Sequence, residues 1–218
     1  MWRNNGLSIV LVSLFALSMA GQAVTGWYDH NESERQHGAQ PVGFGEYLLS
    51  GHFWEATGEN WESEFLQMTA FVLLTAFLYQ KGSAESKRVG VVEEVDLDPR
   101  SFADQPDVPW PVRRGGFVLG LYENSLGMAF AGLFLVSIAM HALGGRIEFN
   151  NEQISHGQQP VTLARYLASS RFWFESFQNW QSEFLSLAAM VVATIYLRQR
   201  YSGESKPVFA PHEETGKA

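Results

Sequence analysis

Two glutamates occupy the same place in a heptapeptide that occurs twice in the chain. The sequence reads NWESEFL from Asn60 and NWQSEFL from Asn179. Glu64 and Glu183 each lead directly into an apolar run. Two carboxylates that meet in a medium of low dielectric raise each other's pKa, so that one of them can carry a proton. The pattern therefore makes Glu64 and Glu183, with Asn60 and Asn179 beside them, a candidate polar pair for proton or ion transfer.

The same heptapeptide also has an explanation that involves no activity. Asn60 is a suitable N-cap, because its side-chain oxygen can accept hydrogen bonds from the first free amides of a helix. Glu62 and Glu64 would then lie at the positive end of the helix dipole, with Trp61 at a membrane interface. Gln181 replaces Glu62 in the second copy, so only the second glutamate recurs. We favour this structural interpretation.

A second motif, His-Gly-x-Gln-Pro-Val, also occurs twice. Histidine with nearby glutamate and asparagine can bind a divalent metal, but one histidine per copy lacks the paired spacing of a zinc-binding helix. A turn in which the motif caps or packs is the favoured interpretation, so the sequence predicts no metal and no cofactor. The candidate residues of this loop motif are His37, Gln40, Pro41, His156, Gln159 and Pro160.

The two motifs belong to a longer internal similarity. Shifting the chain by 119 positions aligns Asn5–Lys87 with Asn124–Lys206 without a gap. Chance similarity between apolar helices would match Leu with Val, and would not reproduce His-Gly and Gln-Pro at fixed spacing. We therefore predict a tandem duplication, since internal repeats at a fixed offset reveal the architecture of a chain.

Long uncharged segments indicate transmembrane helices. Lys, Arg, Asp and Glu are absent from Leu7 to Tyr28 and from Ser125 to Gly145, and each stretch exceeds the 18 or so residues that indicate a span. Shorter apolar runs follow the heptapeptides and approach this length only when Trp61 and Trp180 are included. The sequence thus predicts four transmembrane helices, with the alternative that the shorter runs are buried helices of a soluble protein.

Aromatic residues and glycines suggest where these helices end. Gly26 and Gly145 follow the first span of each repeat and are expected to stop it. A short amphipathic segment then follows in each repeat, and we expect it to lie in the bilayer surface. The tryptophans expected as interfacial anchors are Trp54, Trp61, Trp173 and Trp180.

The predicted fold class is all-α, a polytopic membrane protein with four transmembrane helices from two tandem parallel repeats, each a helix, an interfacial amphipathic segment and a helix. Residues 1–88 form the first repeat, 89–120 an acidic connector, 121–206 the second repeat and 207–218 a disordered tail. Lys and Arg gather in the connector and near both termini, which places these parts in the cytoplasm. The expected location is the cytoplasmic (inner) membrane of a bacterium.

Composition restricts the partners. The net charge of −8 argues against nucleic acid, because phosphate binding requires a basic surface. The chain has no cysteine, which excludes thiol catalysis. It also lacks the sequence motifs of serine hydrolases, nucleoside triphosphatases and dinucleotide-binding enzymes. The expected partners are the lipid bilayer and, in a homo-oligomer, further copies of the chain; any small-molecule or ion ligand is unidentified.

Both repeats resemble a known family. The segments NNGLSIVLVSLFALSMAGQAVTGW, HGAQPVGFGEYLLSGHFWEATGENWESEFLQM and QKGSAESK are similar to a bacterial family of multi-pass membrane proteins known only as a domain of unknown function. The resemblance implies a bacterial cytoplasmic-membrane location and four helices, and it transfers no catalytic residue.

Three function classes follow from the sequence. The favoured class is a non-enzymatic structural, interaction or envelope component, because every motif has a structural explanation. The first alternative is a small proton or ion channel or transporter that uses Glu64 and Glu183. The second alternative is a metal-assisted membrane enzyme that uses His37 and His156.

Overall fold

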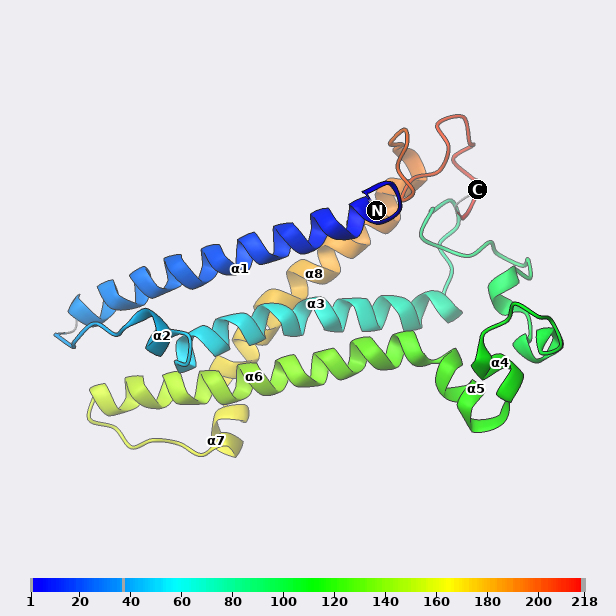
Figure 1. The fold of residues 1–218 in the computed structure, drawn as a ribbon. Helices are drawn as coiled ribbons and strands as arrows, with labels where there is room; N and C mark the ends of the chain where they lie inside the picture. Colours follow the sequence, from blue (N-terminus) through cyan, green and yellow to red (C-terminus); the bar gives the residue numbers. More distant parts are fainter. Residues whose placement is uncertain (1, 37, 217–218) are drawn as a thin grey trace. The chain divides into compact units, whose positions relative to one another are not determined.

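The computed structural model describes residues 2–36 and 38–216, and the regular elements in these ranges are all helical. The predicted all-α class is therefore confirmed. Figure 1 shows the elements in chain order. They are α1 (Trp2–Gln36), α2 (Phe44–Tyr47), α3 (Gly51–Phe77), η1 (Glu94–Asp96), η2 (Pro99–Phe102), α4 (Trp110–Arg114), α5 (Gly116–Glu123), α6 (Ser125–Ser155), α7 (Leu163–Leu167) and α8 (Ser170–Tyr196).

Among the described residues, two helices are long and apolar enough to cross a membrane. They are α1, with 35 residues, and α6, with 31, and each contains an 18-residue window of mean hydropathy 2.0. Only 6% of the window in α1 and 17% of that in α6 is buried. By length and composition, these two helices could each span a bilayer.

Helices α1 and α6 do not end at Gly26 and Gly145, and this part of the prediction is wrong. Both helices continue for about three further turns, to Gln36 and Ser155. The glycines serve another purpose, because a Cβ atom at Gly26 would overlap the Tyr47 hydroxyl, and one at Gly145 would overlap the corresponding Tyr166 hydroxyl.

The two helices end instead at the glycine of the His-Gly motif. Gly38 and Gly157 have φ values of +76° and +70°, in the left-handed region that glycine enters without strain. The Ala39 amide donates to the Glu34 carbonyl at 2.9 Å, and the corresponding bond 119 residues later is 2.7 Å. This is the Schellman arrangement, which satisfies the last carbonyls of a helix. The chain then turns back toward α2 and α7 (Figure 1).

Helices α3 and α8 begin earlier than the heptapeptides predict. Helix α3 starts at Gly51 and α8 at Ser170, so Asn60 and Asn179 lie inside helices and cannot act as N-caps. Trp54 likewise belongs to α3 and not to a separate interfacial segment. The helices extend toward their N-termini because the residues preceding the heptapeptides contain no proline.

The chain divides into two compact units, and each combines parts from both halves of the sequence. The first contains Met1–Glu59 and Ser137–Trp173; the second contains Asn60–Val136 and Phe174–Ala218. The first unit includes α1, α2, α7 and parts of α3 and α6. The second includes α4, α5 and most of α8.

The connector and the described part of the tail contain short helices and hydrogen bonds to other parts of the chain. The connector contains η1, η2, α4 and the start of α5. Lys206, the residue before the tail, is 1% exposed, and its Nζ donates to the carbonyl oxygens of Gly82 at 2.6 Å and of the tail residue Glu214 at 2.7 Å. The Gly216 amide donates to the Ser83 carbonyl at 2.9 Å.

Candidate functional site

In the first unit, two asparagines that lie 119 positions apart, Asn31 and Asn150, each hold the backbone of the loop that follows their helix. The Asn31 side chain accepts a hydrogen bond from the Val42 amide at 2.7 Å and donates to the Val42 carbonyl at 3.0 Å. Asn150 makes the same two bonds to Val161, at 2.7 and 3.1 Å. Val42 and Val161 lie outside the helices, so their amides have no helical partner, and the asparagine side chains supply one.

A tyrosine packs beneath each of these loops in the first unit. Tyr47 is 1% exposed and Tyr166 is fully buried. Their rings meet Phe53 and Phe172 edge-on, each with centroids 5.7 Å apart. Aromatic pairs favour this geometry, because the positive edge of one ring faces the negative face of the other. The loop motif thus closes over a small aromatic core.

The first of these two aromatic cores carries a pair of histidines beside its tyrosine. The Tyr47 hydroxyl lies 3.2 Å from His52 Nδ1, and the His30 and His52 rings are 5.3 Å apart. Burial lowers the pKa of His52; the Glu148 charge opposes this effect, the His30 charge adds to it, and the Asp29 charge again opposes it. Burial also raises the pKa of Tyr47. The second core has Phe149 and Arg171 at the positions of the two histidines.

Helices α3 and α6 cross closely in the first unit. A Cβ atom at Gly58 would overlap the backbone of His141, and one at Gly144 would lie 2.5 Å from the Glu55 amide nitrogen. Such backbone approach between helices requires glycine on the facing surfaces. His141, which is fully buried, stacks on Phe172 with ring centroids 4.7 Å apart.

The buried positions near this crossing are polar to an unusual degree. Thr57 is 2% exposed and receives a hydrogen bond from the Gln22 side chain at 3.1 Å. Glu55 is 8% exposed and Ser137 is 1% exposed. By contrast, Leu7 on α1 is 76% exposed. Polar side chains inside and apolar side chains outside are the distribution expected of helices that pack together in a bilayer.

In the second unit, a hydrogen bond to Glu62, which is not one of the predicted pair of glutamates, joins the two heptapeptides. Glu62 is fully buried, and its Oε1 accepts a hydrogen bond from Trp180 Nε1 at 2.9 Å. Gln67 Nε2 donates to the Glu183 carbonyl at 2.9 Å and to Ser186 Oγ at 3.3 Å. These bonds join α3 to α8 across 116 to 119 positions of the sequence.

The predicted pair itself is close enough for its charges to interact. Glu64 is exposed and Glu183 is half-buried, and the Glu64 charge acts on the Glu183 carboxyl group. Asn60 is exposed, whereas Asn179 is half-buried and donates to the Glu175 carbonyl of its own helix at 3.2 Å. The Asn179 amide group is therefore engaged by the backbone of α8.

The predicted anchors have varied environments. Trp61 and Trp180 are half-buried, and Trp54 and Trp173 are 40% and 42% exposed. Trp173 Nε1 donates to the Leu167 carbonyl at 3.0 Å, which ties the start of α8 to α7. The tryptophans thus combine an apolar body with a satisfied or accessible ring nitrogen, as side chains at a membrane interface do.

The loop motif does not present a metal site in the described part of the chain. His37 lies outside the described residues. His156 is exposed, and its Nδ1 lies 2.8 Å from the Glu152 carbonyl of its own helix. No group of three or more His, Asp or Glu side chains in residues 2–36 and 38–216 is arranged to hold a metal ion. The exposed remainder of the motif consists of Gln40, Pro41, Gln159 and Pro160.

Sequence reasoning misses three features of these sites. The recurring pattern gives little weight to Glu62, because Gln181 replaces it in the second copy. Asn31 and Tyr47 are recognisable only as residues that recur 119 positions later. The available signal is that an asparagine and a tyrosine occur again at the same distance from the second His-Gly-x-Gln-Pro-Val motif. Such residues can supply hydrogen bonds and packing to a loop whose backbone groups have no partner in a helix.

Comparison with known proteins gives one match. No curated protein and no solved structure matches this chain. The model of a domain of unknown function, DUF6766, matches residues 1–217. The match covers nearly the whole chain, and the chain therefore belongs to the DUF6766 family.

Proposed function

We propose that this protein is a multi-pass integral membrane protein that acts as a non-enzymatic structural or interaction component of a bacterial envelope. The observation that carries the proposal is the inverted distribution of side chains. His141, Thr57 and Glu62 are buried, while Leu7 on α1 and Leu135 on α6, the two helices long and apolar enough to cross a membrane, are 76% and 63% exposed. Water would penalise this arrangement and a bilayer favours it.

In this proposal, α1, α3, α6 and α8 each cross the bilayer, and the two repeats have the same orientation. The parts of α3 and α8 from Trp61 and Trp180 onward, 61–77 and 180–196, have 17 residues each, the lower end of the length that a span needs. The distribution of Lys and Arg supports cytoplasmic termini and a cytoplasmic connector in an inner membrane. The asparagine–valine loops would then lie on the opposite side.

The non-enzymatic role is supported by what the recurring motifs do. The glycine of the His-Gly motif ends a helix, Asn31 and Asn150 hold a loop, and the heptapeptide residue Trp180 donates to Glu62 and so joins α8 to α3. Each motif therefore has a structural use that requires no substrate.

Alkaline carbonate extraction of membranes from cells that produce the full-length protein tests membrane integration. The protein should remain in the pellet, together with a known multi-pass protein, while a peripheral protein is released. Recovery in the supernatant would contradict the proposal.

A second candidate function is proton or ion passage, which the effect of the Glu64 charge on the Glu183 carboxyl group favours. Proteoliposomes that contain the protein should then show proton or cation flux above empty liposomes, and the double variant Glu64→Gln/Glu183→Gln should lose it. Glu204→Gln, at an exposed position outside the helices, serves as the control. Flux equal to that of empty liposomes would remove this candidate.

A further inference from the structure

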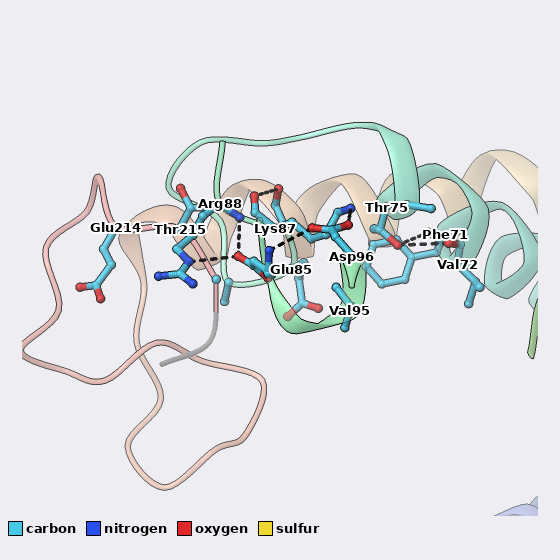
Figure 2. A pocket seen from close by; sticks show the side chains of 15 residues that line it. Phe71, Val72, Thr75, Glu85, Lys87, Arg88, Val95, Asp96, Glu214 and Thr215 are labelled. Carbon is cyan, nitrogen blue, oxygen red and sulfur yellow. Dashed lines mark hydrogen bonds and ion pairs between the residues drawn. The ribbon is translucent and has the colours of Figure 1, made fainter. Parts of the chain in front are cut away.

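A charged cavity lies in the second unit, where the end of α3 meets the connector and the tail. Its volume is about 790 Å³, within the range of small-molecule sites. Figure 2 shows Phe71, Val72 and Thr75 gathered at one end of the cavity and the tail residues Glu214 and Thr215 at the other. One end is therefore apolar and the other end is polar.

The polar end holds charges of both signs. Lys87 Nζ donates to Asp96 Oδ1 at 2.6 Å, and Arg88 Nε donates to Glu93 Oε1 at 3.1 Å (Figure 2). The hydrogen bond from Lys87 lowers the pKa of Asp96, and the bonds from Arg88 lower that of Glu93, so both acids are ionised at neutral pH.

Acidic groups outnumber basic groups around this cavity. Glu85 and Glu214 line it in addition to the two ion pairs, which gives four carboxyl groups against two cations. Such a surface complements a headgroup that contains an ammonium, and the two cations complement a phosphate in the same headgroup. A purely anionic headgroup would meet an excess of two negative charges.

An apolar groove continues from the apolar end. This second cavity, of about 250 Å³, shares Phe71, Thr75, Glu85 and Ser86 with the first. Its remaining lining comes mainly from apolar side chains of α3 and α8, within the second unit. They are Leu74, Leu78, Phe184, Leu187, Ala188 and Val191.

We propose that the two connected cavities bind one amphiphile, an aminophospholipid, whose ammonium and phosphate occupy the charged cavity and whose acyl chain enters the α3–α8 groove. Glu85 lines both cavities, and in this proposal its carboxyl group receives the ammonium. The proposal goes beyond the proposed function and rests on it only for the source of the ligand, since a protein in the bilayer is surrounded by such lipids.

Native mass spectrometry of the purified full-length protein in detergent tests the headgroup. Lysophosphatidylethanolamine and lysophosphatidylglycerol with the same chain are titrated separately. The ethanolamine lipid should bind about tenfold more tightly, which corresponds to one charge-assisted hydrogen bond. Equal binding, or preference for the glycerol lipid, would overturn the proposal. Dodecylamine bound as tightly as the ethanolamine lipid would also overturn it, because the phosphate would then contribute nothing.

Matched variants locate the ligand. Glu85→Gln should remove the preference for ethanolamine, whereas Glu204→Gln, in the corresponding Glu-Ser-Lys sequence outside both cavities, should preserve it. Leu187→Trp should fill the groove and weaken both lipids about tenfold. Leu185→Trp, which is 67% exposed and does not line the groove, should leave binding unchanged. Equal effects of Leu187→Trp and Leu185→Trp would place the acyl chain elsewhere.

These measurements are independent of membrane integration. Failure in carbonate extraction would contradict the proposed function and leave the headgroup preference to be measured in detergent. Failure of the headgroup preference with a protein that stays in the membrane pellet would contradict the lipid site alone.

Discussion

Two asparagines show how single side chains complete this fold. Asn31 and Asn150 each satisfy one amide and one carbonyl of a valine that no helix can satisfy. A buried backbone group without a partner costs about 1–3 kcal/mol, so each asparagine contributes to the stability of the fold by satisfying such groups.

We expect Asn31→Ala to destabilise the protein by about 1–3 kcal/mol, because it leaves the Val42 amide without its partner, whereas the Val42 carbonyl keeps the hydrogen bond from Trp27 Nε1 at 2.8 Å. Thermal unfolding of the purified protein in detergent measures the effect. Asn31→Asp should cost less, since a carboxylate still accepts from the Val42 amide. Gln36→Ala is the control, because the Gln36 side chain makes an exposed bond to Glu32 at 3.3 Å on its own helix. Equal melting temperatures for Asn31→Ala and Gln36→Ala would contradict the assigned role.

His52 lies near the start of α3, before its apolar part, and should make the free energy of unfolding depend on pH. Burial holds its pKa in the folded protein below the unfolded value of about 6.5. Between these two values the unfolded chain binds more protons, so stability falls as the pH falls through about 6.5 and the effect is absent at higher pH. The groups that face His52 are Asp29 and His30 on α1, Tyr47 on α2 and Glu148 on α6.

Melting temperatures measured from pH 7.5 to 5.0 test this dependence. The wild-type curve should decline on acidification, and His52→Asn should decline less. His156→Gln, at an exposed position in the loop motif, is the matched control and should follow the wild type. Parallel curves for wild type and His52→Asn would show that another group controls the response to acid.

At the scale of the helices, the crossing of α3 and α6 depends on glycine. A Cβ atom at Gly58 meets the backbone of His141, which cannot move aside as a flexible side chain could. Gly58→Ala should therefore destabilise the protein by about 1–3 kcal/mol, the usual cost of overpacking. Gly132→Ala on α6, where nothing lies within 4 Å of the added atom, should be neutral or stabilising by about 0.4–1 kcal/mol.

Thermal unfolding of both variants in the same detergent makes this comparison. The two substitutions should change stability in opposite directions. Alanine has a higher helix propensity than glycine at both positions, so a loss of stability at Gly58 alone reports the contact with α6. A Gly58→Ala variant as stable as Gly132→Ala would show that the two helices do not approach as closely as the structure indicates.

The helices also show what sequence reasoning can and cannot reach. Apolar runs without charge predict the helical class and the two most apolar helices, because burial in lipid is a matter of composition over about 20 residues. Helix ends are harder to predict. Gly26 and Gly38 are both glycines after an apolar helix, and only the backbone φ of Gly38 and the tyrosine beneath Gly26 distinguish a stop from a packing contact.

The candidate site depends even more on distant residues. Glu62 becomes important through Trp180, which lies 118 positions away. No local sequence pattern predicts that contact. Because Glu62 has no counterpart in the second heptapeptide, the sequence comparison gives it little weight. The carboxyl pair of Glu64 and Glu183 is accessible to sequence reasoning only because the internal similarity suggests that the two residues have equivalent places.

At the scale of the whole molecule, the number of membrane crossings decides between two topologies. Composition alone supports crossings by α1 and α6. If only these two cross, the loop after α1 and the connector lie on the same side, and the loop after α6 lies on the other side. If all four long helices cross, the two loops share one side and the connector faces the opposite side.

The absence of cysteine makes this difference measurable, because each introduced cysteine is the only thiol in the chain. We expect Ala39→Cys and Gln158→Cys to react with a membrane-impermeant maleimide from outside intact spheroplasts, and Gln105→Cys and Glu213→Cys to react only after lysis. All four positions are exposed, so a failure to react before lysis reports the membrane barrier and not burial in the protein. The two-span topology predicts a different pattern, in which positions 39 and 105 react together and position 158 does not. That result would contradict the four-span proposal while leaving integration in the membrane intact, because two crossings also resist extraction by carbonate.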